Sequence, residues 1–396
     1  MSQSLTPPAL VTPLELSGLE AVRLLGRRNL RVYGYDANPD AIGRYSRYRR
    51  QLPGRELLEG LLALEGAVVI PTADHAVWWL QSNAAALAGR VRFVIPTPEI
   101  IESCTDKVRL CAWAGQAGVP AVPCLPLDHL LDNPDACALP CVVKRRGKYH
   151  ASEPDPILRG RKFLLLSEPR QVAQVLAAAP REVLREHLVQ EYLLPHGGHP
   201  AIYITGYLSA RGHQVSFAHH KLWTVPPQGG RGVYLELIER GALEERVMAW
   251  LREVGYTGLF GAEFLYDGRD EVYRLLDFNP RFGVGDSIGI GCGIDMAHIA
   301  YQDAQGLWEG TSRRRAGSRP ARWVSEFDFL SSVIKPRPSF TVVQTPAWRS
   351  WFYRPLQKAL WDLRDPIPFF VAARMFAGNG VRKARKFLSR RPRGAA

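Results

Sequence analysis

Short runs of apolar residues alternate with amphipathic stretches through the first 120 residues. The runs have the length of strands and fall at 9–11, 31–35, 66–72 and 91–95. Between the first two, residues 18–28 place Leu19, Val22 and Leu25 on one side of a helix. Strands that alternate with helices predict a parallel sheet whose faces are covered by helices. We therefore predict an α/β domain with a Rossmann-like βαβ order over residues 1–120.

The pattern changes after a Pro-rich, extended connection at 119–127. Strand-like runs then follow one another with hairpin-like spacing, at 140–144, 163–166, 189–193, 201–208 and 214–220. Helical patterns fall at 171–179, from Glu239 or Arg240 to about Val254, and at 294–305. This is an α+β arrangement with an antiparallel sheet. We predict a smaller subdomain over 121–195 and a larger one over 196–310.

From residue 311 onward the composition becomes basic and aromatic. Residues 311–396 hold 19 Lys and Arg against four acids, a net charge of +15, which leaves −2 for residues 1–310 of a chain whose total is +13. A basic extension on a nearly neutral body favours docking or anchoring over nucleic-acid binding. We predict a helical tail with two alternative roles: peripheral contact with an anionic membrane, or a lid that packs on the body.

One predicted hairpin, over residues 259–293, carries an unusual set of polar side chains. Its first run contains Glu263, and its second run ends in Asp277, Asn279 and Arg281. Carboxylate and amide oxygens are ligands that Mg²⁺ accepts. A guanidinium beside them can hold a phosphoryl group. We predict that Glu263, Asp277 and Asn279 are metal ligands.

The register of this hairpin decides whether the two carboxylates can share an ion. If residues 267–270 form a plain four-residue loop, Glu263 lies opposite Arg274 and Asp277 faces the other side of the sheet. A shared metal site therefore predicts a three- or five-residue loop, or a β-bulge.

Composition disfavours several classes of protein. No apolar run approaches the ~18 residues of a transmembrane helix, and the first residues lack the basic start of a signal peptide. Six cysteines without zinc-site spacing favour a reduced, cytoplasmic protein. Asp36 ends the second strand, but no G-x-G-x-x-G precedes it, so we expect no nicotinamide site. We interpret Asp36 as a turn or helix-cap residue.

Five motifs occur in a defined order along the chain. They are Thr105-Asp106-Lys107 with Gly118-Val119-Pro120, Val142-Val143-Lys144, Gln190-Glu191-Tyr192, Glu263, and Asp277-Phe278-Asn279-Pro280-Arg281. This order resembles the ATP-grasp superfamily and, within it, the carboxylate–amine ligases, most closely the D-aspartate ligase type. The resemblance covers residues 10–310. It implies a pre-ATP-grasp domain over 1–120, a two-subdomain ATP-grasp fold, and the tail over 311–396.

The resemblance also implies ATP and Mg²⁺ (or Mn²⁺) as cofactors. The nucleotide-binding set is Lys107, Lys144, Gln190, Glu191, Tyr192 and Leu193. The metal-binding set is Glu263, Asp277 and Asn279. The set that orients the carboxylate or the transferring phosphoryl group is Lys221, Arg231 and Arg281. For the lysines taken singly, a solvated surface position is the alternative.

Two positions depart from the family pattern. Asp277 stands where Glu is usual, which shortens the reach to the metal by one methylene. No acid follows Glu191 closely, so the ribose contact has no assigned residue. His199 is one alternative for it, and a solvated loop histidine is the other.

The implied reaction has two steps: ATP phosphorylates a small-molecule carboxylate, and an amine then displaces phosphate to form an amide. Two alternatives stay open. One is an ATP-grasp kinase or acyl-phosphate enzyme with another acceptor, and the other is a non-catalytic nucleotide-binding module docked on a membrane. We expect a cytoplasmic location, at the inner face of the membrane if the tail is an anchor.

Overall fold

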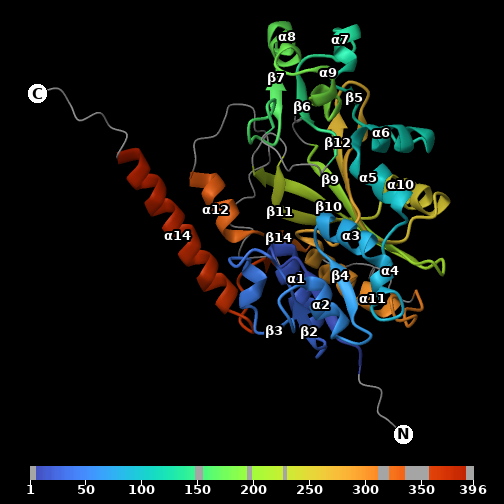
Figure 1. Cartoon of the computed structure of the whole chain (residues 1–396), viewed down its shortest axis with the longest axis vertical. Helices are drawn as coiled ribbons and strands as arrows, with labels where there is room; N and C mark the ends of the chain where they lie inside the picture. The colour runs from blue at the N-terminus through green and yellow to red at the C-terminus, as the bar shows by residue number, and fades with distance from the viewer. Residues whose placement is uncertain are drawn as a thin grey trace, which may run out of the picture.

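The computed structural model describes residues 6–147, 155–193, 199–225, 230–310, 321–334 and 356–388. The strands of this part of the chain form three sheets (Figure 1). The first sheet lies at the end of the molecule near the N-terminus, and the second lies at the opposite end. The third sheet lies between them and includes the predicted hairpin.

The first sheet is parallel, with strand order β3-β2-β1-β4. Its strands are β1 (Ala9–Thr12), β2 (Val32–Gly34), β3 (Arg49–Gln51) and β4 (Val68–Pro71). Its helices are α1 (Leu16–Gly26), the 3₁₀ helix η1 (Ile42–Tyr45), α2 (Leu57–Leu62), α3 (Asp74–Ser82) and α4 (Ala84–Leu87). The predicted parallel α/β arrangement is confirmed.

One predicted strand in this region is wrong. Residues 91–95 form no strand, and Arg92 makes a single bridge to Val68. The end of the run contacts the segment before β12 instead, where Thr257 Oγ1 donates to the Ile95 carbonyl at 3.1 Å. Asp36 is a turn residue, as interpreted: its carboxylate accepts hydrogen bonds from the N–H groups of Leu14 at 2.6 Å and Asn38 at 2.8 Å.

The second sheet is small and antiparallel, with order β5-β8-β6-β7. Its strands are β5 (Cys124–Pro126), β6 (Cys141–Arg145), β7 (Leu164–Leu166) and β8 (His187–Glu191). Helices α5 (Pro98–Thr105) and α6 (Lys107–Gln116) precede it, and α7 (His129–Asp132), α8 (Pro169–Ala177) and α9 (Arg181–Arg185) belong to it. Leu127, Val143 and Val189 are fully buried in its core.

The third sheet has seven strands in the order β13-β12-β9-β10-β11-β14-β15. They are β9 (Ala201–Leu208), β10 (Gln214–Val225), β11 (Arg231–Ile238), β12 (Gly258–Asp267), β13 (Val272–Asn279), β14 (Arg322–Val324) and β15 (Leu356–Lys358). Its helices are α10 (Ala242–Glu253), the 3₁₀ helix η2 (Asp286–Cys292), α11 (Met296–Asp303) and α12 (Glu326–Ile334). Residues 356–358 thus complete the edge of the sheet beyond residue 310.

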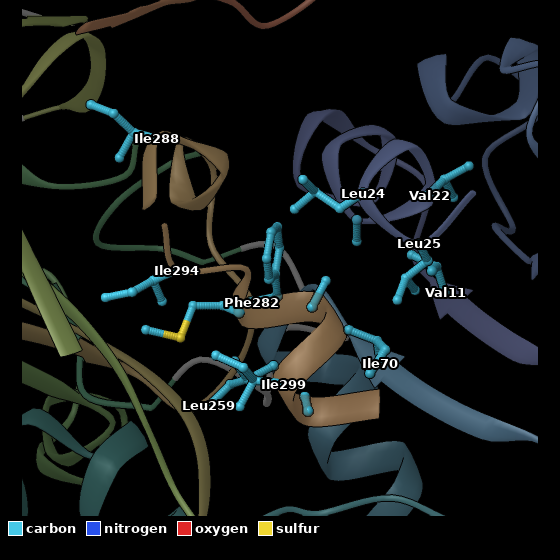
Figure 2. Close-up of a cluster of buried hydrophobic side chains, with 14 of the residues drawn as sticks. Val11, Val22, Leu24, Leu25, Ile70, Leu259, Phe282, Ile288, Ile294 and Ile299 are labelled. Carbon is cyan, nitrogen blue, oxygen red and sulfur yellow. The ribbon is translucent and has the colours of Figure 1, made fainter. Parts of the chain in front are cut away.

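A shared core joins the first domain to the third sheet. Figure 2 shows Leu25 and Ile70 of the first domain on one side of this core, with Phe282 and Ile299 near its centre. All four side chains are buried. Phe282 follows the hairpin directly, and its N–H donates to the carbonyl of Pro71 at the end of β4. The first domain is therefore held against the segment that leaves the hairpin.

The C-terminal part of the chain returns to α1 before it enters the last helix. The guanidinium of Arg23 donates to the Asp365 carboxylate at 2.9 Å and to the carbonyls of Ala359 and Leu360 at 2.8 and 2.9 Å. Helix α14 (Ile367–Leu388) then runs along the outside of the molecule (Figure 1). Among the helices that the structure describes, none is long and apolar enough to cross a membrane.

Candidate functional site

Glu263 and Asp277 stand directly opposite each other in the hairpin of β12 and β13. One step nearer the turn, Phe264 pairs with Leu275, so Leu276 is an extra residue in β13. This irregularity is the β-bulge predicted from the sequence, and the prediction is confirmed. Without it, the two carboxylates would face opposite sides of the sheet.

The turn of the hairpin is held by an arginine–carboxylate network. Asp267 accepts from Arg269 Nε at 2.8 Å and from Arg274 Nε at 2.7 Å. These hydrogen bonds, that from Arg269 foremost, keep the pKa of Asp267 well below its usual range. Arg269 also donates to both oxygens of Glu191, at 2.5 and 3.1 Å. The turn is therefore fixed to the end of β8, where the predicted adenine-binding residues lie.

Each of the paired carboxylates binds a lysine from a different element. Lys107, the first residue of α6, places Nζ 2.5 Å from Asp277 Oδ1. Lys221, on β10, places Nζ 2.6 Å from Glu263 Oε2. The side chains of Lys221 and Glu263 are 8% and 13% exposed, so this pair is well shielded from water. The structure thus brings four predicted site residues into one cluster.

Tyr203 contacts Lys221 and Asn279 of the site. It was not predicted from the sequence. The Lys221 ammonium lies 5.3 Å from the centre of its ring, a cation–π contact. Its hydroxyl is 3.5 Å from Asn279 Nδ2. Space for that hydroxyl exists because residue 261 is glycine: a Cβ there would lie 2.0 Å from the Tyr203 oxygen. A tyrosine on an apolar strand gave no sequence signal beyond core packing.

Lys144 follows the three buried residues that begin β6, and it is itself partly buried. Its pKa falls to about 7 because burial disfavours the ammonium and because Lys107 adds a second positive charge. Asp277 and Glu263 act in the opposite direction but do not cancel these effects. An anion placed between the two lysines would be attracted by both, and it would restore the proton on Lys144.

Arg281 connects the hairpin to the first domain. Its Nη2 lies 3.3 Å from Asn279 Oδ1, and its Nε lies 3.3 Å from Asp74 Oδ1. Burial opposes the charge of Arg281, yet the neighbouring acids, Asp74 foremost, outweigh it and raise its pKa. Sequence reasoning missed Asp74. The available signal was its position just after a parallel strand, where α/β sheets place ligand contacts.

Two buried acids organise the segment that follows Arg281. Asp286 accepts from Thr205 Oγ1 at 2.9 Å and from the Gly283 N–H at 2.6 Å, and Glu20 accepts from the Gly285 N–H at 3.1 Å. Burial raises the pKa of Asp286 to about 6 and that of Glu20 to about 8. These contacts hold the segment from Gly283 to Gly285 in place, and neither acid belongs to the Glu263–Asp277 cluster.

The remaining predicted residues lie around the cluster. Gln190 is buried, with Nε2 3.5 Å from the Val122 carbonyl, and the Tyr192 N–H donates to the Pro140 carbonyl at 3.0 Å. Leu193 is buried next to them. Arg231 pairs with Asp328 of α12 instead of joining the Glu263–Asp277 cluster. His199 stacks on Tyr266 with ring centres 3.8 Å apart.

The side-chain oxygens of Glu263, Asp277 and Asn279 suit a hard cation that also binds phosphate oxygens. Within the described ranges no group of three or more His, Cys, Asp and Glu side chains is arranged to hold a metal by itself. Mg²⁺ is usually held by one or two carboxylates together with substrate phosphates and water. Glu263, Asp277 and the Asn279 amide, with lysines beside them, meet that requirement.

No family model and no curated protein matches this chain. Solved structures do match. An ADP complex of N5-carboxyaminoimidazole ribonucleotide synthetase is 10% identical, covers 81% of this chain and 82% of its own, and has a TM-score of 0.59. The chain has the ATP-grasp fold.

Two further ATP-grasp structures agree with this assignment. The synthetase of the same name from Thermus thermophilus is 18% identical over 78% of this chain and 80% of its own, with a TM-score of 0.57. A Campylobacter jejuni biotin carboxylase bound to an ATP analogue is 15% identical over 78% of this chain and 73% of its own, with a TM-score of 0.58. At these identities the likeness concerns the fold, and the predicted ATP-grasp architecture is confirmed.

Proposed function

We propose that this protein is an ATP-dependent ligase that activates a carboxylate as an acyl phosphate and joins it to an amine. The observation that carries the proposal is the Glu263–Asp277 pair, set on one face by a β-bulge and bound by lysines of two other elements. Two of the similar structures are complexes with ADP and with an ATP analogue, which supports nucleotide binding here.

The nucleotide and the metal would share this cluster. Glu263, Asp277 and Asn279 would hold Mg²⁺ or Mn²⁺, and the ion would supply positive charge against the phosphates. Lys107 would turn from Asp277 toward the phosphate oxygens, and Lys144 would contact them beside it. The adenine would lie against the end of β8, where the predicted set is Gln190, Glu191, Tyr192 and Leu193.

The chain's own groups would position the two substrates. Arg281 would hold the transferring phosphoryl group or the acyl phosphate, with Asp74 fixing the guanidinium from the other side. Lys221 would orient the substrate carboxylate. Arg231 stands further out in this structure, paired with Asp328, and would have to leave that partner to contribute. Catalysis would rest on positioning and on neutralisation of charge.

An ADP-release screen against pairs of carboxylates and amines, with Mg²⁺, tests this function. A ligase forms ADP with the carboxylate in the first step but turns over continuously only when the amine is also present, so dependence of steady-state ADP release on the amine separates it from a kinase with another acceptor. We expect Asp277→Asn to lower the rate by about 10²-fold or more, the scale of one lost electrostatic contact in a transition state.

Asp270→Asn is the matched control, since Asp270 lies in the same hairpin and pairs with Arg274 at the turn. Equal rates for Asp277→Asn and the parent chain would rule out the proposed metal site. Nucleotide binding without turnover on any pair would favour the non-catalytic module.

We further propose that residues 1–120, 121–195, 196–310 and 311–396 are separate functional units. We also propose that the last of these, the tail, contacts an anionic membrane. Leu363, Ile367 and Phe370, around the start of α14, are 83%, 53% and 60% exposed. After Asp365 the sequence adds eight Lys and Arg residues and no acid. Exposed apolar groups beside basic ones suit an interfacial contact.

Co-sedimentation with vesicles tests the membrane contact. Binding to phosphatidylglycerol-containing vesicles but not to pure phosphatidylcholine, weakened by Phe370→Ser, is the expected result. Absence of binding to either kind would favour the alternative role as a lid.

A further inference from the structure

Two cysteines face each other beside the nucleotide-site lysines. Cys111 lies on α6 and Cys124 is the first residue of β5. Their sulfur atoms are 2.8 Å apart, and the Cys124 thiol donates to the Cys111 sulfur. Both are free thiols and both are partly exposed, so small reagents can reach them. A disulfide bond measures about 2.05 Å, so its formation needs a small approach of the two sulfurs.

The pair bridges two bodies of the fold. On α6, Leu110 and Ala114 are buried in the core of the third sheet, together with Phe260. Cys124 belongs instead to the second sheet, where it pairs with Gln190 of β8. A bond between Cys111 and Cys124 would therefore fasten the second sheet to an element of the third sheet's core.

The pair also adjoins the lysines of the cluster. The Cys124 sulfur lies 3.4 Å from the carbonyl oxygen of Lys107, the residue that binds Asp277. The hydrogen bond from Cys124, assisted by the charges of Lys107 and Lys144, lowers the pKa of the Cys111 thiol. Cys111, the acceptor of that hydrogen bond, is taken as the attacking thiol.

We propose that Cys111 and Cys124 are a redox modification site whose reversible disulfide weakens nucleotide binding. The effect on the nucleotide rests on the proposed function, whereas formation of the disulfide does not. The proposed nucleotide site needs Lys144 of the second sheet and Asp277 of the third sheet to adjust around one ligand. A covalent link between the two bodies restricts that adjustment.

The oxidant is a low-molecular-weight disulfide such as oxidised glutathione. The Cys111 thiolate attacks one of its sulfurs, which forms a mixed disulfide and releases one glutathione thiolate. Cys124 loses its proton and attacks the Cys111 sulfur, which forms the Cys111–Cys124 bond and releases the second glutathione. Two protein thiols are oxidised and one glutathione disulfide is reduced to two thiols.

The test begins with the reduced full-length protein, incubated with increasing oxidised glutathione. Intact mass should fall by two hydrogen atoms, and peptide mapping should identify Cys111 linked to Cys124. Affinity for a fluorescent ATP analogue with Mg²⁺ should weaken about tenfold, within the usual range of coupling between sites, and recover with dithiothreitol.

The variants Cys111→Ser and Cys124→Ser should bind the analogue as the reduced protein does and resist the oxidant. Cys137→Ser, whose partner is Cys141, is the matched control and should remain sensitive. Thermal unfolding checks that each variant is folded, and alanine variants at the same positions replace any that is not.

The outcomes separate the two proposals. If the linked pair does not form, or other cysteines are linked, the modification site is overturned. If it forms and affinity for the analogue is unchanged, the control of nucleotide binding is overturned while the proposed function stands. If the reduced protein does not bind the analogue at all, the proposed function fails, and with it the regulatory role of the pair.

Discussion

At the scale of single residues, the lowered pKa of Lys144 predicts a pH dependence of nucleotide binding. Lys144 is charged below about pH 7 and neutral above it. A phosphate binds the ammonium form, so binding above pH 7 must be accompanied by uptake of a proton. We expect the affinity for ATP to fall as pH rises from 6 to 9, by at most about tenfold per pH unit.

Calorimetric titration at several pH values measures this dependence, and Lys144→Arg provides the comparison because arginine stays charged. A parallel pH dependence in both proteins would assign the effect to ATP itself.

The pH dependence of folding stability has the opposite sign to that of ATP affinity. The unfolded lysine keeps its proton up to about pH 10.4, whereas the folded one loses it above about pH 7, so stability gained from this group rises with pH between those values.

A second prediction at this scale concerns Gly261. A methyl group there would meet the Tyr203 hydroxyl, so Gly261→Ala must displace the ring or the strand under the Glu263–Asp277 pair. We expect a loss of about 1–3 kcal/mol in stability, as for overpacked cores, and weaker Mn²⁺ binding.

Thermal unfolding and paramagnetic titration with Mn²⁺ measure the two effects. Gly115→Ala is the control, since a Cβ at that helical position meets nothing within 4 Å. Unchanged Mn²⁺ binding in Gly261→Ala would mean that Tyr203 does not support the metal site.

The residue types of the site could be predicted from the sequence, but their partners could not. Glu263 and Asp277 were identified from the hairpin, and their register left two possibilities that only the position of Leu276 decides. Tyr203 was invisible because tyrosine on a strand is ordinary core material. Its position depends on Gly261 of the neighbouring strand β12, and such a contact between strands cannot be read from the sequence.

At the scale of elements, the segment before α14 depends on one buried ion pair. Asp365 is fully buried and accepts from Arg23 Nε, from Ser46 Oγ at 2.7 Å and from the Arg47 N–H at 2.8 Å. Removing the carboxylate leaves the buried guanidinium of Arg23 with Asp362, 3.8 Å from its Nε, as a more distant counter-charge. We expect Asp365→Ala to lose about 3–5 kcal/mol of stability.

Urea unfolding of the full chain measures that loss, and exposed Asp40→Ala serves as the control. A loss below about 1 kcal/mol, the value of a surface pair, would show that this segment is not held by Asp365. The sequence did not predict this contact, because Asp365 counted there only as one of four acids in a basic tail.

Elements were predicted best where apolar periodicity was long. Strands β9, β10, β12 and β13 and the helix α10 follow from it, whereas β11, β14 and β15 of the same sheet were not predicted. Residues 91–95 looked like a strand and are not one. Periodicity reports the burial of side chains, and it does not report whether a neighbouring strand has room and donors for a ladder. The end of this run contacts Thr257 instead of a strand of the first sheet, which is a tertiary contact.

At the scale of the whole molecule, the Asp74–Arg281 contact joins the first domain to the hairpin that carries the site. Asp74 is a positioning residue in this view, since it acts on substrate through the guanidinium of Arg281. With Asp74→Ala, Arg281 keeps Asn279 as a partner but loses its nearest counter-charge and the contact that orients it. We expect kcat of ADP release to fall about 10–100-fold, equivalent to about 1.4–2.7 kcal/mol, with little change in KM for ATP.

A purely structural role would instead lower stability and leave the ratio of kcat to KM in the folded fraction unchanged. Two variants separate the cases. Asp74→Glu keeps the charge and should recover part of kcat, while His75→Ala, the exposed neighbour on α3, should match the parent chain. If Asp74→Ala retains full kcat, Arg281 is oriented by the hairpin alone. The first domain would then contribute packing to the site through Phe282 and Pro71, and no part of its chemistry.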